Sequence, residues 1–451
     1  MFKKIEIWIL YLALVIGFIL TIIFGHLVKK SLQQEDYSNR TFLQKVSIVL
    51  ASIPSNFQSI FTIVSDPGNE FIKKNNVNKK QLTREKIIFR NELLLLSRFN
   101  PKKNRSIVEI VELDSFKVLH SYEPNIDKIN KFTDTSREEF QDLLLNNSPE
   151  RYYIWNPLID GKGNLIFNSY SPLVKIDFCS NILWVNDEDN FHHSSNFDVN
   201  ENIWVPSSIF PFQVDEKYVG KSFLYFKDDG ITKISPEGKI LFQKSVSQIL
   251  IDNGFKHLLF GHQEFKGDPI HLNDIQPVLK STKYFEKGDV FLSLRNLSYI
   301  ILYRPSTNKI IQIISGPFSN QHDVDIINDK EISIFNNNTI NAKNDRFVEK
   351  SNQVIIYDFE KKKFTYKFRE QIEKLNVNTS SDGLSEILDD GSLFIDQRNS
   401  GRLLMLDSLG NLVWEYYNLH DDKAYDIWWS RIIKDKKLIN AILEKISKTK
   451  C

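Results

Sequence analysis

The chain has 451 residues, of which 41% are hydrophobic and 25% charged, so it is long enough to bury a sizeable core. Its 58 Lys and Arg side chains nearly balance its 57 Asp and Glu side chains, and this net charge of +1 argues against a nucleic acid or another acidic polymer as partner. Only two cysteines, Cys179 and Cys451, are present, which excludes CxxC metal clusters, and nothing in the sequence indicates that they pair.

The N-terminus carries a long apolar run over residues 7–28, with lysines on both sides of it. At about 1.5 Å per residue, a helix of this length crosses the ~30 Å hydrocarbon core of a bilayer. A cleaved signal peptide is the alternative, but its apolar region is usually ~7 to 15 residues long, and a small-residue exit is missing here. We therefore expect residues 1–30 to form a single, uncleaved transmembrane anchor.

The orientation of this anchor does not follow from the lysines, because two stand on each side: Lys3 and Lys4 before the run, Lys29 and Lys30 after it. A short N-terminal flank followed by a large domain usually leaves that domain outside the cytoplasm. We therefore expect the protein to be a single-pass membrane protein whose main domain faces the periplasm or the outside.

Residues 31–89 are predicted to form a partly helical, membrane-proximal stalk. Apolar residues between Phe42 and Leu50 keep a helical period, and Pro54 interrupts it. The segment 83–99 fits either a further helix or the first strand of the next domain, because its run of four leucines is too short to decide. The sequence leaves open whether the stalk pairs two chains into a homo-oligomer.

A hairpin pattern recurs along the rest of the chain: an alternating apolar strand, a short polar turn and a second alternating strand. Its six copies start near residues 107, 173, 231, 299, 354 and 401. This spacing is close to the ~40 to 50 residues of a propeller blade once loop insertions are allowed. We therefore predict an all-β fold, a six-bladed β-propeller over residues 90–435, with a C-terminal tail at 436–451.

Three units contain a histidine in a polar turn ahead of an apolar strand: His193, His271 and His322. His193 and His322 each stand nine residues before the last polar residue ahead of a strand, and His271 begins a longer version. The same offset selects Trp155 and Gly383 in two other units. Because equivalent positions of a radial repeat meet at its axis, we expect the three imidazoles to face one small volume.

A second shared position follows the strands that begin at residues 290, 332 and 393. Their sixth residues are Arg295, Asn337 and Arg398. A channel mouth with histidine, asparagine and arginine side chains suits a small tetrahedral anion, because arginine offers a planar fork of donors. A neutral imidazole can attack an electrophilic centre held there.

Each of these residues also has a purely structural interpretation, and only the shared register favours a site. Three histidines could instead bind zinc, although Arg295 would repel a cation, so we predict no metal and no cofactor. We interpret His192 as a surface or packing residue, and we assign the tryptophans to blade packing: Trp155, Trp204, Trp414, Trp428 and Trp429.

The motifs resemble those of the bacterial aryl sulfate sulfotransferases, nucleotide-independent periplasmic six-bladed propellers that move a sulfuryl group from one phenol to another. The similar motifs lie between Asn156 and Tyr417: His192-His193, His271-Leu272-Asn273-Asp274, Ser293-Leu294-Arg295, Gln321-His322-Asp323 and Gly410-Asn411-Leu412-Val413-Trp414-Glu415-Tyr416. The resemblance implies an aryl sulfate donor, a phenolic acceptor and a transiently sulfated His322. It also implies that four residues bind and polarise the sulfuryl oxygens: His193, His271, Asn273 and Arg295.

The chain departs from this family's pattern in two places. Ser194 stands where the family often has aspartate, and the disulfide that the family often carries near the site is not expected from two cysteines so far apart. If these departures spoil the site, the alternative is a non-catalytic propeller that binds an anionic ligand or a protein partner at the membrane surface. A metal-dependent hydrolase or lyase is the third hypothesis.

Overall fold

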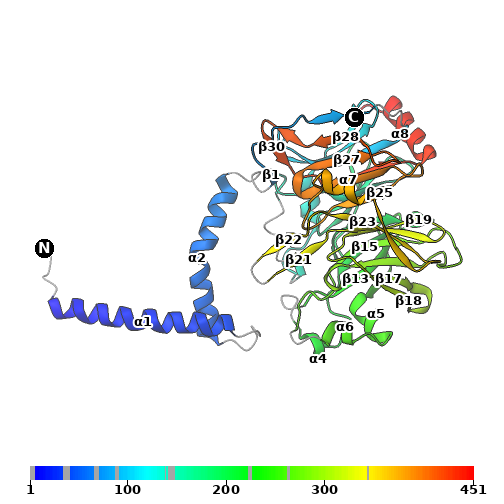
Figure 1. The fold of residues 1–451 in the computed structure, drawn as a ribbon. Helices are drawn as coiled ribbons and strands as arrows, with labels where there is room; N and C mark the ends of the chain where they lie inside the picture. The colour runs from blue at the N-terminus through cyan, green and yellow to red at the C-terminus, as the bar shows by residue number, and fades with distance from the viewer. Residues whose placement is uncertain are drawn as a thin grey trace. The chain divides into compact units, whose positions relative to one another are not determined.

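The computed structural model describes residues 6–33, 41–65, 71–86, 91–137, 139–140, 148–221, 226–261, 265–342 and 345–451. The chain divides into two compact units, residues 1–69 and 70–451 (Figure 1). The first unit is helical, and the second is mostly β. The domain boundary expected at residues 89 and 90 lies outside the described residues, as do Lys3 and Lys4.

Two helices make up the first unit, α1 (Ile7–Gln33) and α2 (Phe42–Ser65). The apolar stretch within Ile7–Ser31 has a mean hydropathy of 2.8 and is not buried, so by length and composition α1 is a candidate membrane span or signal sequence. The buried hydroxyl of Ser31 donates to the carbonyl of Gln44 and joins the two helices. α2 continues through Pro54, where we expected an interruption, because one internal proline weakens a helix without excluding it.

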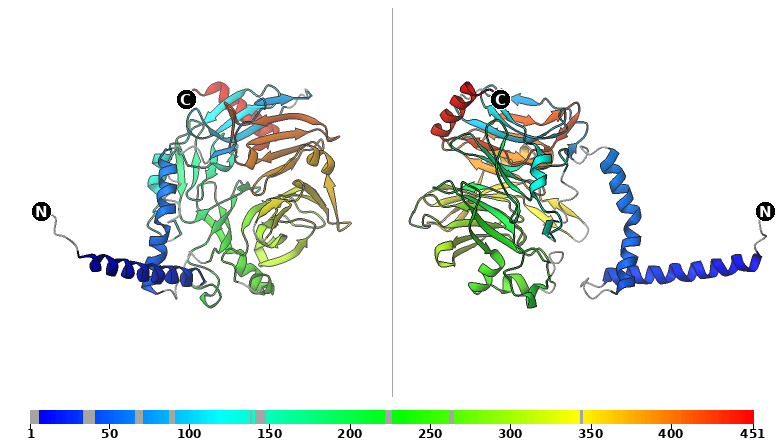
Figure 2. Two further views of the ribbon diagram at one scale, coloured as in Figure 1. Left: turned by 60° about the vertical axis from the view of Figure 1, so that its left-hand side comes forward. Right: turned by 180° about the vertical axis from the view of Figure 1, so that it is seen from behind.

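Six antiparallel sheets of four or five strands follow one another along the described part of the second unit (Figures 1 and 2). The first three, in pairing order, are β31 (Arg431–Ile433), β3 (Leu93–Asn100), β4 (Arg105–Glu112) and β5 (Val118–Tyr122); β6 (Trp155–Ile159), β7 (Leu165–Asn168), β8 (Leu173–Ile176) and β9 (Ile182–Asn186); and β10 (Asn190–Phe191) with β11 (Asn196–Phe197), β12 (Ile203–Ser208), β13 (Asp229–Ile234) and β14 (Ile240–Ser245).

The next three sheets are β15 (Leu272–Pro277), β16 (Val290–Leu294), β17 (Tyr299–Arg304) and β18 (Lys309–Ser315); β19 (Asp323–Asn328), β20 (Glu331–Asn336), β23 (Gln353–Asp358) and β24 (Lys363–Lys367); and β25 (Leu384–Ile387), β26 (Leu393–Gln397), β27 (Arg402–Leu406), β28 (Leu412–Tyr417) and β2 (Leu82–Arg84). Two small sheets join β1 (Ile72–Lys74) to β30 (Lys423–Tyr425) and β29 (Leu419–His420), and β21 (Thr339–Asn341) to β22 (Arg346–Val348). Short helices connect some strands: α3 (Ile126–Ile129), α4 (Glu216–Val219), α5 (Val246–Asp252), α6 (His257–Phe260) and α7 (Arg369–Lys374).

The six hairpins predicted from the sequence are confirmed, and each supplies a pair of adjacent strands to a different sheet. They are β4–β5, β8–β9, β13–β14, β17–β18, β23–β24 and β27–β28. The turn of the last one shows why the sequence folds in this way. The Asp407 carboxylate accepts hydrogen bonds from the backbone N–H groups of Leu409 and Asn411, and Gly410 has φ of +86°. Short polar side chains and glycine thus close the turn locally.

Buried apolar clusters join each sheet to the next. Ile203 and Val205 of the third sheet pack with Leu173 of the second, for example, and four further clusters connect the other successive sheets. The sixth sheet packs on the first through a cluster that contains Phe394 and Leu94. The pairing of β31 with β3 also joins the two ends of this unit.

Parts of the expected stalk and tail belong to the β-rich unit. Within the segment expected as stalk, β1 pairs with β30 and β2 pairs with β28. The segment expected as tail forms helix α8 (Lys436–Lys448), whose N-terminus is capped by Asp435 and whose Ile439 and Ile442 are buried. Cys451 then forms a disulfide with Cys179. The sequence did not indicate this pairing, because the two cysteines meet only when α8 packs on the second sheet.

We expect Cys451→Ser to lower the free energy of unfolding of the β-rich unit by about 2 to 4 kcal/mol. The disulfide closes a loop between residues that are 272 positions apart, and this restricts the unfolded chain. Urea unfolding of the oxidised protein and the variant would measure the difference. Wild-type protein treated with a reductant should behave like the variant, and equal midpoints for all three samples would contradict the prediction.

Candidate active site

One polar cavity of about 180 Å³ lies where the first strands of the six sheets meet. Each of these strands contributes at least one lining residue: Asn156 of β6, Asn196 of β11, Asp274 of β15, Asp323 of β19, Glu386 of β25 and Arg431 of β31. His193, His271 and His322 stand just ahead of β11, β15 and β19. The three predicted histidines therefore share one end of this set of strands.

A residue with positive φ stands just before each of these strands or, in β6, at its second residue. The six are Asn156 (36°), His193 (56°), His271 (51°), Asn320 (52°), Asp382 (59°) and Trp429 (46°). Non-glycine residues rarely adopt this conformation, and such residues concentrate at functional sites. A constrained turn therefore recurs at this end of the strands in each of the six sheets.

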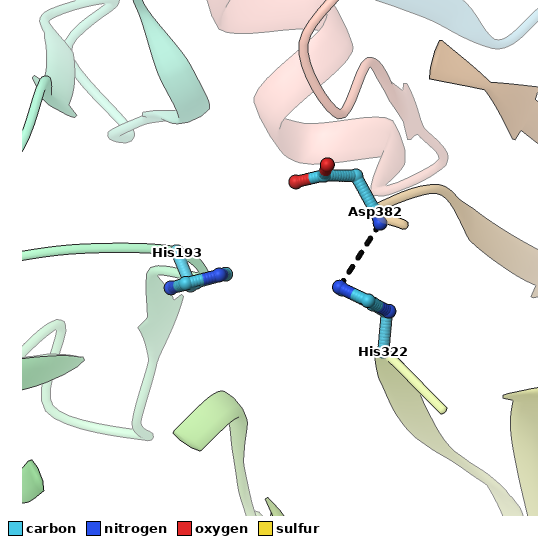
Figure 3. A group of neighbouring side chains, drawn as sticks. All are labelled: His193, His322 and Asp382. Carbon is cyan, nitrogen blue, oxygen red and sulfur yellow. Dashed lines mark hydrogen bonds between the residues drawn. The ribbon is translucent and has the colours of Figure 1, made fainter. Parts of the chain in front are cut away.

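The structure brings the three histidines together. The ring centres of His193 and His271 are 5.1 Å apart, and those of His193 and His322 are 6.4 Å apart. Figure 3 shows His193 and His322 on opposite sides of a gap, with Asp382 above it. Trp155 and Trp429 complete the surroundings, with ring centres 5.5 and 6.2 Å from that of His193.

The hydrogen bonds of His322 select one neutral form of its imidazole. Nδ1 lies 2.6 Å from Oδ1 of Asn337, whose amide nitrogen donates to the carbonyl oxygens of Thr379 and Asp382. Because the oxygen of Asn337 must then accept, the proton of the neutral ring sits on Nδ1. Nε2 carries the lone pair and accepts from the backbone N–H of Asp382 at 2.9 Å (Figure 3).

Burial lowers the pKa of His322 to about 3, with the positive charge of Arg295 adding to the effect. We therefore expect any reaction at Nε2 to keep most of its pH 7 rate at pH 5. A histidine with an ordinary pKa near 6.5 would be only ~3% neutral at pH 5 and would lose most of its rate. Rates of covalent labelling of His322 between pH 5 and 8 would check this, and a fall of tenfold or more at pH 5 would contradict it.

His193 and His271 have different partners. Burial holds the pKa of His193 well below its usual value, and its Nδ1 lies 2.8 Å from Nδ1 of His192. His192 is itself buried, so it is a packing residue and does not lie at the surface. It also lies 3.3 Å from a carboxylate oxygen of Asp229, and it therefore helps to position His193. Nδ1 of His271 lies 2.7 Å from Oδ2 of Asp268. Burial raises the pKa of Asp268, but the hydrogen bond to His271 outweighs it and holds this pKa below its usual value.

Arg295 begins the short 3-10 helix η4 (Arg295–Leu297) directly after β16. Its Nη1 donates to Asn296, its Nε has no hydrogen-bond partner among the described residues, and no carboxylate in that part of the chain forms an ion pair with it. Burial lowers the pKa of Arg295 to about 10, and the nearby charge of Arg346 contributes. Arg295 therefore remains charged at neutral pH, with donor capacity to spare for an anion.

Asn273 occupies the irregular position where the pairing of β15 with β16 shifts, between Leu272 and Asp274. Its side-chain nitrogen donates to the carbonyl of Gln321 at 3.0 Å, while its buried Oδ1 has no partner within the described structure. Asn273 thus fixes the backbone immediately before His322.

The residues that our candidate set omits are Asp382, Arg398 and Asn337. Asp382 and Arg398 line a small hollow together with Trp155, His193 and Trp429, two of which we assigned only to packing. Nη1 of Arg398 lies 2.6 Å from Oδ1 of Asp382. Burial raises the pKa of Asp382, but Arg398 and His322 outweigh this effect and lower the pKa to about 2. The shared register contains the signal for these residues, because Asp382 precedes Gly383 and the other two occupy the sixth strand position.

A metal could use one atom each of His193, His322 and Asp382, since these atoms lie within 4.8 Å of one another. Two imidazoles and a carboxylate suit a transition metal. In this arrangement, however, the carboxylate of Asp382 forms an ion pair with Arg398, and Nε2 of His322 accepts a hydrogen bond from the N–H of Asp382. His322 and Asp382 are therefore held by hydrogen bonds in this structure.

The fold is similar to several solved structures at low sequence identity. A protein of unknown function from Bacteroides caccae has a TM-score of 0.47 and 11% identity, covering 76% of this chain and 99% of that chain. A streptogramin B lyase gives 0.40 and 9%, covering 78% and 96%, and the Pan2 WD40 domain of Neurospora crassa gives 0.39 and 9%, covering 72% and 76%. No curated protein matches this chain.

The family model for arylsulfotransferase (ASST) matches residues 160–419. This range is more than half of the chain and contains all three histidines of the site. The chain therefore belongs to the arylsulfotransferase family.

Proposed function

We propose that this protein is a membrane-anchored aryl sulfotransferase that moves a sulfuryl group from an aryl sulfate to a phenol through a sulfated His322. The observation that carries the proposal is the hydrogen bonding of His322, whose Nδ1 lies against Oδ1 of Asn337 and whose Nε2 faces the backbone N–H of Asp382. Together with burial, which lowers its pKa to about 3, this arrangement favours a neutral imidazole with its lone pair on Nε2. A neutral, oriented imidazole is a competent nucleophile. Family membership supports the same chemistry.

In the first step, Nε2 of His322 attacks the sulfur, an N–S bond forms, and the bond from sulfur to the aryl oxygen breaks. Sulfuryl transfer, like phosphoryl transfer, depends mainly on positioning and on stabilising charge. Arg295 has donors left for the sulfuryl oxygens, because it forms no ion pair among the described residues. The N–H of Asp382 must leave Nε2 when the substrate binds.

The leaving phenolate needs a proton. His193 stays neutral because of its burial, so we assign the proton to His271, whose Nδ1 is hydrogen-bonded to the carboxylate of Asp268. A carboxylate partner stabilises a protonated imidazole. In the second step, a phenol attacks the sulfur, its proton returns to His271, the N–S bond breaks, and the aryl sulfate product leaves His322 free.

Incubation of the wild-type protein with 4-nitrophenyl sulfate should release 4-nitrophenol in a burst and leave one sulfuryl group on the chain. This result is expected because a two-step transfer accumulates a covalent intermediate when no acceptor is present. Intact-mass analysis followed by peptide mapping would locate the group. Binding of the aryl sulfate without labelling would favour the non-catalytic anion-binding alternative.

We also infer a closed six-bladed propeller and an anchored location. The ring of apolar clusters from the first sheet to the sixth and back, and the cavity that the six first strands line, support the closed propeller. The length and exposure of α1 support a single membrane anchor. The disulfide between Cys179 and Cys451 supports a domain outside the cytoplasm, since disulfides persist in oxidising compartments.

A metal-dependent hydrolase or lyase is the second candidate, and the close approach of His193, His322 and Asp382 favours it. Such an enzyme would hold about one transition-metal ion per chain and lose activity with a chelator. Elemental analysis of the purified protein separates this candidate from the sulfotransferase, for which we expect neither result.

A further inference from the structure

The hairpin β21–β22 is an insertion that begins at the candidate site. After β16 and β26, the connections to the next strand cover only residues 295–298 and 398–401, and they begin with Arg295 and Arg398. The equivalent connection after β20 covers residues 337–352 and begins with Asn337, the partner of His322. Equivalent connections of a repeat lie on the same side of the domain. The inserted hairpin therefore belongs to the side that carries the histidines.

Two hydrogen bonds attach this hairpin to the loop that contains Asp382. Oγ1 of Thr339 donates to the carbonyl of Ser380 at 3.0 Å, and Nη2 of Arg346 donates to the same oxygen. Ile340 and Phe347 are cross-strand partners on the opposite face of the hairpin, where they are exposed. Arg346 therefore points to the side of the Asp382 loop.

The charges at this position are incompletely matched. Arg398 is paired with Asp382, whereas Arg346 forms no ion pair within the described part of the chain and donates to a backbone carbonyl. Burial lowers the pKa of Arg295, and repulsion from the positive charge of Arg346 lowers it further. Arg346 is exposed, and a guanidinium has five N–H donors, so most of its donors are available to a ligand.

We propose that Arg346 is a specificity residue that binds a second anionic group, a carboxylate or a sulfonate, on an aromatic ligand whose first anionic group lies among the histidines and Arg295. The preferred donors and acceptors would then be aromatic compounds with a negative charge on the ring in addition to the reacting sulfate or phenol. This inference rests on the proposed function for the identity of the reacting group, but the subsite itself is a matter of binding. It can therefore be tested without turnover.

The test uses the full-length protein in detergent micelles and ligands that cannot transfer a sulfuryl group. Calorimetry would compare benzenesulfonate with 3-sulfobenzoate and 4-sulfobenzoate. We expect at least one sulfobenzoate to bind about tenfold more tightly than benzenesulfonate, because its carboxylate accepts charge-assisted hydrogen bonds from the guanidinium of Arg346. In Arg346→Gln this ratio should fall to near one, and in Arg346→Lys it should be intermediate, because lysine keeps the charge without the planar fork.

Lys350→Gln is the matched control, because Lys350 is an exposed cation on the same insertion. It should keep the wild-type ratio. Equal affinities of all three ligands for the wild type, a wild-type ratio in Arg346→Gln, or no binding of any ligand would each overturn the proposal. A sulfobenzoate preference that depends on Arg346, in a protein that aryl sulfates never label, would support the subsite and reject the transfer. Labelling without such a preference would reject the subsite alone.

Discussion

Substituting His322→Ala should abolish the sulfated intermediate and reduce turnover of 4-nitrophenyl sulfate by a factor on the order of 10³ or more. Alanine has no lone pair to attack sulfur, and the remaining groups of the site then have no nucleophile to assist. The measurements are the steady-state release of 4-nitrophenol in the presence of a phenolic acceptor and the intact mass after exposure to the donor alone.

His257→Ala provides the matched control for this experiment, because His257 is an exposed histidine on helix α6. It should retain both the turnover and the label. Full turnover in His322→Ala would refute the assignment of His322 as nucleophile. A label that persists in His322→Ala and maps to another histidine would move that role within the site, with His193 and His271 as the residues to examine.

Arg295→Ala should lower kcat/KM for the same donor by about 10² to 10³, because it removes a preorganised donor and a positive charge from the sulfuryl oxygens. The sulfated form of His322 should still appear, only more slowly, because the nucleophile is intact. This slow labelling distinguishes the arginine variant from His322→Ala. Arg295→Lys should recover part of the rate, since the charge returns without the bidentate geometry.

The matched control is Arg369→Ala. Arg369, on helix α7, lies over the ring of Tyr366 and has no contact with the histidines in the described structure. Its kcat/KM should stay within about twofold of wild type, as for most surface substitutions. An Arg295→Ala protein as active as the wild type would contradict a role for this guanidinium in transfer.

Local sequence patterns determined the hairpins and the candidate membrane helix. A hairpin such as β27–β28 depends on alternating apolar residues and on a turn closed by Asp407 and Asn411, all within one short segment. The apolar run of α1 likewise specifies a helix by itself. The repeat register carried this local information further, because it identified His193, His271 and His322 as equivalent positions that the structure brings together.

Tertiary structure alone decided which groups complete the site and how the chain is joined. The bond from the N–H of Asp382 to His322 joins turns of two different sheets, so no local pattern specifies it. The bond from His322 to Asn337, in contrast, joins the two ends of the hairpin β19–β20. The pairing of β31 with β3 and the disulfide between Cys179 and Cys451 join residues from opposite ends of the β-rich unit. Such contacts form only when distant segments have packed together, because the free energy that holds them comes from the burial of the whole domain.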